Sequence, residues 1–215
     1  MNTPILNYMA MVIPILFALT VHEYSHGYIA YRLGDNTAKN MGRLTLNPIS
    51  HIDPIGMIML FIIGMGWAKP VPINMYAFSR PKRDLAVSAA AGPLSNFIMA
   101  AIVGLLFRIF PQLQPMQGDT GILLFLKLNL FYFLLINVGL GIFNLIPIPP
   151  LDGSKILRGF LPDSKVHIID YLERYGGILL LAIVFLGRVS GFSVFGRLIG
   201  PLIYGMVNFF SGISL

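Results

Sequence analysis

The chain has 215 residues, of which 56% are hydrophobic and only 11% are charged. Soluble domains carry about 25% charged residues, so this composition indicates a polytopic membrane protein. The sequence contains no cysteine, which excludes disulfide frameworks, thiolate nucleophiles and cysteine metal ligands. The formal net charge of +6 does not point to a nucleic-acid partner, because the basic residues lie between apolar runs, where they anchor and orient membrane spans.

We expect an all-α polytopic membrane protein with about five to six transmembrane helices, built as a single integral-membrane domain over 1–215. The first apolar run lacks a basic segment before it, so we interpret it as a first span and not as a removed signal peptide. Neither end carries an appended soluble domain in this interpretation. The apolar runs predict spans near 5–31, 85–107, 121–146, 175–190 and 198–213.

The uncharged segment that begins at Pro54 is too short for an ordinary span and leads into "GWAKPVPIN". Pro70 and Pro72 alternate there with Val71 and Ile73, which fits extended backbone better than a helix. We therefore expect a short re-entrant β-hairpin near 54–76 that enters and leaves the membrane on one side.

The basic residues predict the orientation of the spans. If the first span ends in the cytoplasm at Arg32, most basic residues fall on that side, as the positive-inside rule requires. That set is Arg32, Lys39, Arg43, Lys69, Arg80, Lys82, Arg83, Lys155, Arg158, Lys165 and Arg174. The remaining four are Arg108, Lys127, Arg188 and Arg197.

The stretch "HEYSH" places two histidines and a glutamate inside the first apolar run. His22 and His26 are four residues apart, so on a helix they lie about 40° apart around the axis. Two imidazoles at this spacing can hold one zinc ion, and Glu23 falls on the same arc, where it can take the proton of an activated water molecule. A charged residue in a span costs about 2.5–3.5 kcal/mol on insertion scales, so packed histidines without a metal are the weaker interpretation.

A hydrolytic zinc site needs a third protein ligand. Asp152 is the best candidate, because it closes "FNLIPIPPLDG", where three prolines end the third long span and leave the backbone non-helical. Such backbone at membrane depth is tolerated only if it is buried or lines a wet cavity. A turn aspartate before Gly153 is the alternative.

These residues carry a family resemblance. "HEYSH", "AGPLSN" at Ala91–Asn96 and "NLIPIPPLDG" at Asn144–Gly153 together resemble the site-2 protease family of intramembrane zinc metalloproteases. "LTLNPISHIDPIG" and "GWAKPVPIN" are similar to its compact prokaryotic branch, which lacks a PDZ-like or nucleotide-sensing domain. The resemblance covers roughly residues 12–156.

The resemblance implies one Zn²⁺ per chain, with His22, His26 and Asp152 as ligands and Glu23 as general base. It implies that Asn144 and Asn96 line the site near the substrate strand or the developing oxyanion; hydrogen bonding between helices is their alternative role. The implied substrate is a transmembrane helix of another membrane protein, cut within the lipid bilayer. The resemblance also implies a multi-pass protein of a prokaryotic cell membrane, with the site nearer the cytoplasmic side.

His51, in "SHIDP", could support the site or gate it, but a turn histidine that bonds Asp53 is the favoured interpretation. The rival functions are a metal transporter and a catalytically inactive relative that binds membrane helices. Transporters usually show internal repeats, which this sequence lacks, and an inactive relative would be expected to lose Glu23 or a ligand. The sequence favours no particular oligomer.

Overall fold

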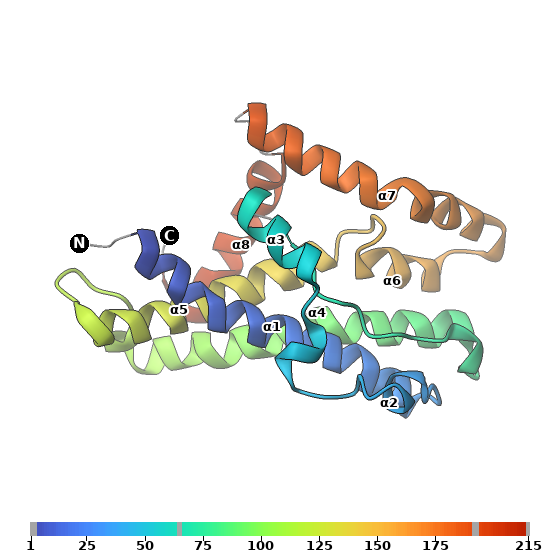
Figure 1. Cartoon of the computed structure of the whole chain (residues 1–215), viewed down its shortest axis with the longest axis horizontal. Coiled ribbons are helices and arrows are strands. Elements are labelled where there is room, and N and C mark those ends of the chain that lie inside the picture. The colour runs from blue at the N-terminus through green and yellow to red at the C-terminus, as the bar shows by residue number, and fades with distance from the viewer. Residues whose placement is uncertain (1–3, 64–65, 191–193, 214–215) are drawn as a thin grey trace.

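The computed structural model describes residues 4–63, 66–190 and 194–213, and nearly all of its regular structure is helical (Figure 1). The longest helices are α1 (Pro4–Arg32), α4 (Pro81–Ile109), α5 (Gly121–Asn144) and α7 (Asp163–Ser190). The shorter elements are α2 (Thr37–Asn40), α3 (Pro54–Ile63), α6 (Asp152–Phe160), α8 (Val194–Ser211), and the 3-10 turns η1 (Pro48–His51), η2 (Met75–Ala77) and η3 (Pro111–Leu113). The all-α prediction is confirmed for the described residues.

Three of the described helices are long and apolar enough to cross a membrane, judged by length and composition: Ile5–Arg32, Pro81–Ile109 and Gly121–Asn144. They lie side by side as a bundle in which α4 runs antiparallel to α1 and α5 (Figure 1). The two remaining predicted spans, near 175–190 and 198–213, fall on α7 and α8. Of these, α8 packs against α4 and α5, while α7 lies largely outside the three-helix bundle.

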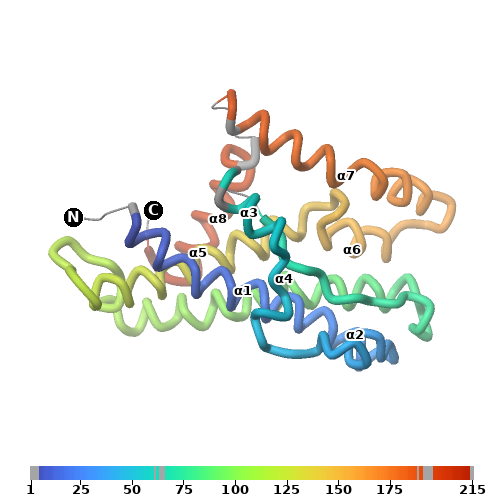
Figure 2. Tube along the Cα trace, in the orientation of Figure 1, coloured from blue at the N-terminus to red at the C-terminus, as the bar shows by residue number. Residues whose placement is uncertain are grey.

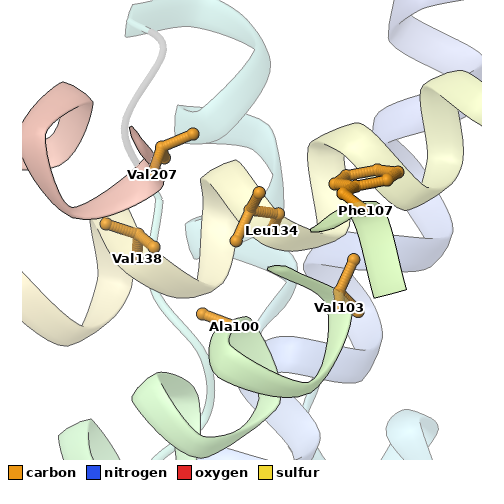
Figure 3. Close-up of a cluster of buried hydrophobic side chains, with 6 residues drawn as sticks. All are labelled: Ala100, Val103, Phe107, Leu134, Val138 and Val207. Carbon is orange, nitrogen blue, oxygen red and sulfur yellow. The ribbon is translucent and has the colours of Figure 1, made fainter. Parts of the chain in front are cut away.

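The core of the bundle lies where α4, α5 and α8 meet (Figure 3). Its members share near-complete burial: Ala100, Val103, Phe107, Leu134, Val138 and Val207. Two glycines bring these helices together, because a Cβ on Gly104 would lie 2.6 Å from the Cβ of Phe210 and one on Gly141 would lie 2.6 Å from the ring of Phe97. Small residues are the usual means of close helix approach in membranes, where apolar surface alone does not drive association.

The chain between α2 and α4 crosses α1 on its way to α3, and it then runs back to the start of α4 (Figure 2). The predicted β-hairpin near 54–76 is wrong for its first half, because residues 54–63 form helix α3. Asp53 starts this helix: its Oδ1 accepts hydrogen bonds from the backbone N–H groups of Ile55 and Gly56, at 2.9 and 3.0 Å. An aspartate cap followed by proline is a common helix start, and a helix satisfies its own backbone groups where no partner strand exists.

The second half of this region is extended, as the prolines predict, but it forms no sheet within the described residues. Its one ladder contact is an isolated antiparallel bridge between Ile52 and Ala68. The returning chain packs on α3 through bare backbone, since a Cβ on Gly56 would lie 2.1 Å from the carbonyl oxygen of Trp67. The element is therefore a helix with an extended return.

Candidate active site

The two histidines of "HEYSH" lie in the C-terminal half of α1, where they contact α4 and Asp152 at the start of α6. His22 and His26 are buried, at 4% and 6% exposure, and Glu23 is half-buried beside them. The rings of His22 and His26 pack edge to face, with their centroids 4.6 Å apart. The four-residue spacing thus brings both imidazoles to one point, as predicted.

Asp152 reaches the same point from the turn that follows α5. It is the first residue of α6 and is 6% exposed. The turn is tight, because a Cβ on Gly153 would lie only 2.3 Å from the carbonyl oxygen of Leu145. Lys155, one turn along α6, places its ammonium 3.4 Å from Asp152 Oδ1 and leaves Oδ2 to face the histidines.

Three potential ligand atoms form a nearly equilateral triangle. Asp152 Oδ2 lies 3.0 Å from the Nε2 atoms of both His22 and His26, and those two nitrogens are also 3.0 Å apart. Ligand atoms held about 2.0–2.1 Å from one zinc ion at tetrahedral angles would lie about 3.3 Å from one another. The donor set of two imidazoles and a carboxylate, its spacing and its burial therefore fit zinc.

Helix α4 supports both histidines from behind. His26 Nδ1 donates to the carbonyl oxygen of Ser88 at 2.8 Å, and His22 Nδ1 donates to Asn96 Oδ1 at 2.7 Å. Gly92, midway between these two partners, is in contact with both rings: a Cβ there would lie 2.4 Å from His26 Nε2 and 2.7 Å from His22 Cε1. With both Nδ1 atoms engaged as donors, both Nε2 lone pairs face Asp152, as metal ligands require.

Asn96 does not take the place that we expected near a substrate. It is fully buried, and its amide group donates to Asn137 Oδ1 at 2.8 Å and to the carbonyl oxygen of Ala18 at 3.3 Å. These bonds use both amide hydrogens, so no donor is left for an oxyanion. Asn137, also fully buried, was not among the predicted site residues; an asparagine within an apolar span was the available signal.

Glu23 is held by the extended segment. Its Oε2 accepts a hydrogen bond of 2.8 Å from the backbone N–H of Val71. The Val71 side chain packs on Gly27, one turn beyond Glu23, where a Cβ would lie 2.9 Å from Val71 Cγ1. The buried Asp35 fixes the end of the same segment by accepting from the N–H of Asn74 at 2.7 Å.

Comparison of this chain with known proteins shows its family. The chain is 37% identical over 177 residues to the "Putative zinc metalloprotease YwhC" of Bacillus subtilis, a match that covers 80% of this chain and 78% of the relative. A family model described as Peptidase family M50 matches residues 124–185. The chain belongs to peptidase family M50.

Two further relatives agree with this assignment. The chain is 33% identical over 180 residues to "Protease RseP" of Photorhabdus luminescens, covering 81% of this chain and 59% of the relative. It is 25% identical over 206 residues to the Rip2 protein of Mycolicibacterium smegmatis, which carries the same kind of name as YwhC, covering 93% of this chain and 73% of the relative. No solved structure matches significantly.

Membership of family M50 shows the activity: the chain is a metalloprotease of the site-2 type, with Zn²⁺ as the metal that the family supports and that the possible site at His22, His26 and Asp152 fits. The apolar helices that carry the site are compatible with action in a membrane. No observation favours a transporter or an inactive relative.

Two further residues predicted for this M50 site form hydrogen bonds with backbone carbonyl groups. Asn144, the last residue of α5, is half-buried, and its Nδ2 donates to the carbonyl oxygen of Leu140 at 3.1 Å. His51 is buried and does not bond Asp53 as favoured: its Nε2 donates to the carbonyl oxygen of Thr45 at 2.8 Å. The side chain of Asp53 instead caps α3, which is why it is not available to the ring.

An apolar cleft of about 590 Å³ lies between α1, α3, α5 and α8. On α1 its wall is formed by Met11, Ile15 and Leu19, at four-residue spacing. Glu23 is the next residue in this row, so the stripe that lines the cleft leads to the glutamate. Gly139 on α5 and Gly200 on α8 are among the residues that line the cleft.

Proposed function

We propose that this protease hydrolyses peptide bonds within transmembrane segments of other membrane proteins, with His22, His26 and Asp152 as the zinc ligands and Glu23 as the general base. The observation that carries the proposal is the triangle of potential ligand atoms, 3.0 Å on each side, buried beside Glu23 in the C-terminal half of an apolar helix long enough to cross a membrane. A polar centre there is costly unless its chemistry takes place at that depth.

Bound zinc, one ion per chain, would activate a water molecule and polarise the scissile carbonyl. The chain's own residues do the rest. Glu23 takes the proton of the attacking water and returns it to the leaving amine nitrogen as the C–N bond breaks. The hydrogen bond from the Val71 N–H keeps the Glu23 carboxylate oriented toward the extended segment that contains Val71. Asn144 offers its second amide hydrogen to the substrate strand or to the developing oxyanion.

The apolar cleft is the proposed path of the substrate. Its lining is almost entirely hydrophobic, and its row on α1 ends at Leu19, one helical turn before Glu23. A transmembrane helix is the occupant that matches both its chemistry and its position. The carbonyl oxygens of the extended segment around Val71 then accept hydrogen bonds from the unwound part of the substrate, because extended peptides bind to exposed extended backbone.

We propose that the whole chain, 1–215, is one integral-membrane domain of about five to six spans. α1, α4 and α5 cross the bilayer, α8 packs against them, and α7 adds its apolar C-terminal half. α3 and its extended return form the re-entrant element in place of a hairpin. The basic residues at the ends of α1 and α6 and at the start of α4 support a site nearer the cytoplasmic side, in a prokaryotic cell membrane.

The test uses the purified protein reconstituted in liposomes with a panel of single-span membrane proteins, and mass spectrometry of the products. We expect cuts inside the apolar segment of at least one panel member. Glu23→Gln should keep its metal and lose cleavage, because it keeps the shape of the side chain but cannot accept the proton. Cuts confined to loops outside the apolar segments would contradict the proposed substrate class, and full turnover by Glu23→Gln would remove Glu23 from its role.

A further inference from the structure

We propose that Asn137, on α5, is a positioning residue that sets the orientation and the tautomer of the zinc ligand His22, acting through Asn96. The inference rests on the metal site proposed above. It extends that site from the two helices that carry His22 and Asn96 to a third helix.

The evidence is a continuous series of hydrogen bonds across α1, α4 and α5. His22 Nδ1 lies 2.7 Å from Asn96 Oδ1, and Asn96 Nδ2 lies 2.8 Å from Asn137 Oδ1. Asn137 Nδ2 in turn donates to the carbonyl oxygen of Phe133, one turn back on α5, at 2.8 Å. Both asparagines are fully buried, so water does not compete for these bonds.

The series has one direction. Because Asn137 gives its Nδ2 hydrogen to the backbone of α5, its Oδ1 is the atom that faces Asn96. Asn96 must then turn its Nδ2 toward Asn137 and Ala18, which leaves its Oδ1 for His22. An oxygen at that place can only accept, so the proton of the neutral imidazole is fixed on Nδ1.

The fixed proton matters for the metal. With Nδ1 protonated, His22 Nε2 carries a lone pair, and it is this atom that lies 3.0 Å from Asp152 Oδ2. If the amide of Asn96 were reversed, its N–H would face Nδ1, the ring proton would move to Nε2, and that nitrogen could not ligate. Asn137 makes the reversed orientation unfavourable, because Asn96 Oδ1 would then face Asn137 Oδ1, and two acceptors would oppose each other in a buried place with no hydrogen between them.

The test measures zinc affinity of the full-length protein in detergent by competition with a chelator. Asn137→Leu keeps the approximate size of the side chain and removes the acceptor. Loss of a partner that orients a ligating histidine typically weakens metal binding by about 10- to 100-fold, and we expect a fall in that range. Asn129→Leu is the matched control, since Asn129 lies two turns earlier on α5 and also donates to the backbone four residues back, at 2.9 Å from Phe125 O.

Two comparisons separate positioning from a merely structural role. In an Asn96→Ala background, Asn137→Leu should cause no further loss of zinc affinity, because its effect passes through Asn96; losses that add would overturn the proposal. In its neutral form Asn137→Asp keeps an oxygen acceptor toward Asn96 and an O–H donor toward Phe133, so it should retain the native affinity. A fall as large as that of Asn137→Leu would also overturn the proposal.

The outcome is distinguishable from failure of the metal site itself. A native protein that takes up no zinc would contradict the proposed site, whereas native zinc binding that Asn137→Leu leaves unchanged would contradict only the role of Asn137. If Asn137→Leu did not yield folded protein, Asn137→Ala would replace it in the same comparisons.

Discussion

The backbone N–H of Val71 donates a hydrogen bond of 2.8 Å to the carboxylate of Glu23. The bond joins the general base proposed on α1 to the extended segment that crosses this helix. The orientation of the proposed base therefore depends on the same segment that we propose contacts the substrate.

Val71→Pro is therefore expected to lower kcat/KM while leaving the zinc content unchanged. Proline keeps an extended backbone but removes the N–H, and a hydrogen bond to a charged group contributes about 1.5–3 kcal/mol, which corresponds to about 10- to 100-fold in rate. Val71→Ala is the control, because it trims the side chain and keeps the donor. Equal losses in the two variants would assign the effect to packing on Gly27 and not to the hydrogen bond.

Gly92→Ala should abolish or strongly weaken zinc binding without a large effect on the rest of the fold. The added methyl group would lie 2.4 Å from His26 Nε2 and 2.7 Å from His22 Cε1, so both rings must move from the ligand triangle. Elemental analysis of the purified variant measures the loss. Gly205→Ala, in helix α8 with no atom within 4 Å of the new methyl group, should keep native zinc content.

Asn144→Ala is expected to behave differently from a change at Asn137. If Asn144 donates to the developing oxyanion, its loss should lower kcat by about 10²- to 10³-fold and leave zinc affinity at the native level. Measuring both quantities on one preparation makes the contrast. A variant that lost zinc instead would place Asn144 in support of the metal, and a variant with native kcat would exclude the proposed donation.

An ion pair stabilises the end of the bundle remote from Arg32. Lys127 Nζ lies 3.0 Å from both carboxylate oxygens of Asp119, and both side chains are nearly buried. The N–H of Met116 and the Lys127 ammonium together hold the pKa of Asp119 below its ordinary value. A lowered pKa adds stability above the ordinary carboxyl range, and that stability is lost as the pH falls toward the lowered value.

Thermal unfolding in detergent should therefore show a loss of stability on acidification that depends on this pair. In Lys127→Met the part of the loss due to Asp119 should shrink, because the carboxylate no longer has its cation. An identical pH profile in the native protein and in Lys127→Met would contradict a contribution from the pair.

The place of His22 in the site could be predicted from the sequence, whereas the place of Asn137 could not. The convergence of His22 and His26 follows from their four-residue spacing, which any helix converts to one face. The place of Asp152 follows from a proline-rich turn that can only lie in protein or in a wet cavity. These signals are local, and the family comparison supports the chemistry that they imply. The contact of Asn96 with Asn137 depends on which faces of α4 and α5 meet. The spacing of residues along either helix does not fix that.

The same distinction applies to residues 54–74. Pro70 and Pro72 correctly indicated extended backbone around Val71, because each proline restricts its own φ. They carried no information on residues 54–63, where Asp53 followed by Pro54 was the start signal of a helix. A hairpin needs two strands, and the two prolines indicate extended backbone only around Val71. They do not support a strand over residues 54–63.

The most direct test of the account is the metal content of the detergent-purified protein, measured by elemental analysis beside His22→Ala, Asp152→Asn and Glu23→Gln. We expect about one zinc per chain in the native protein and in Glu23→Gln, and a clear loss in His22→Ala and Asp152→Asn. Native zinc content in Asp152→Asn would contradict the third ligand. A native protein without zinc, even after zinc is supplied, would contradict the metal centre on which the proposed mechanism depends.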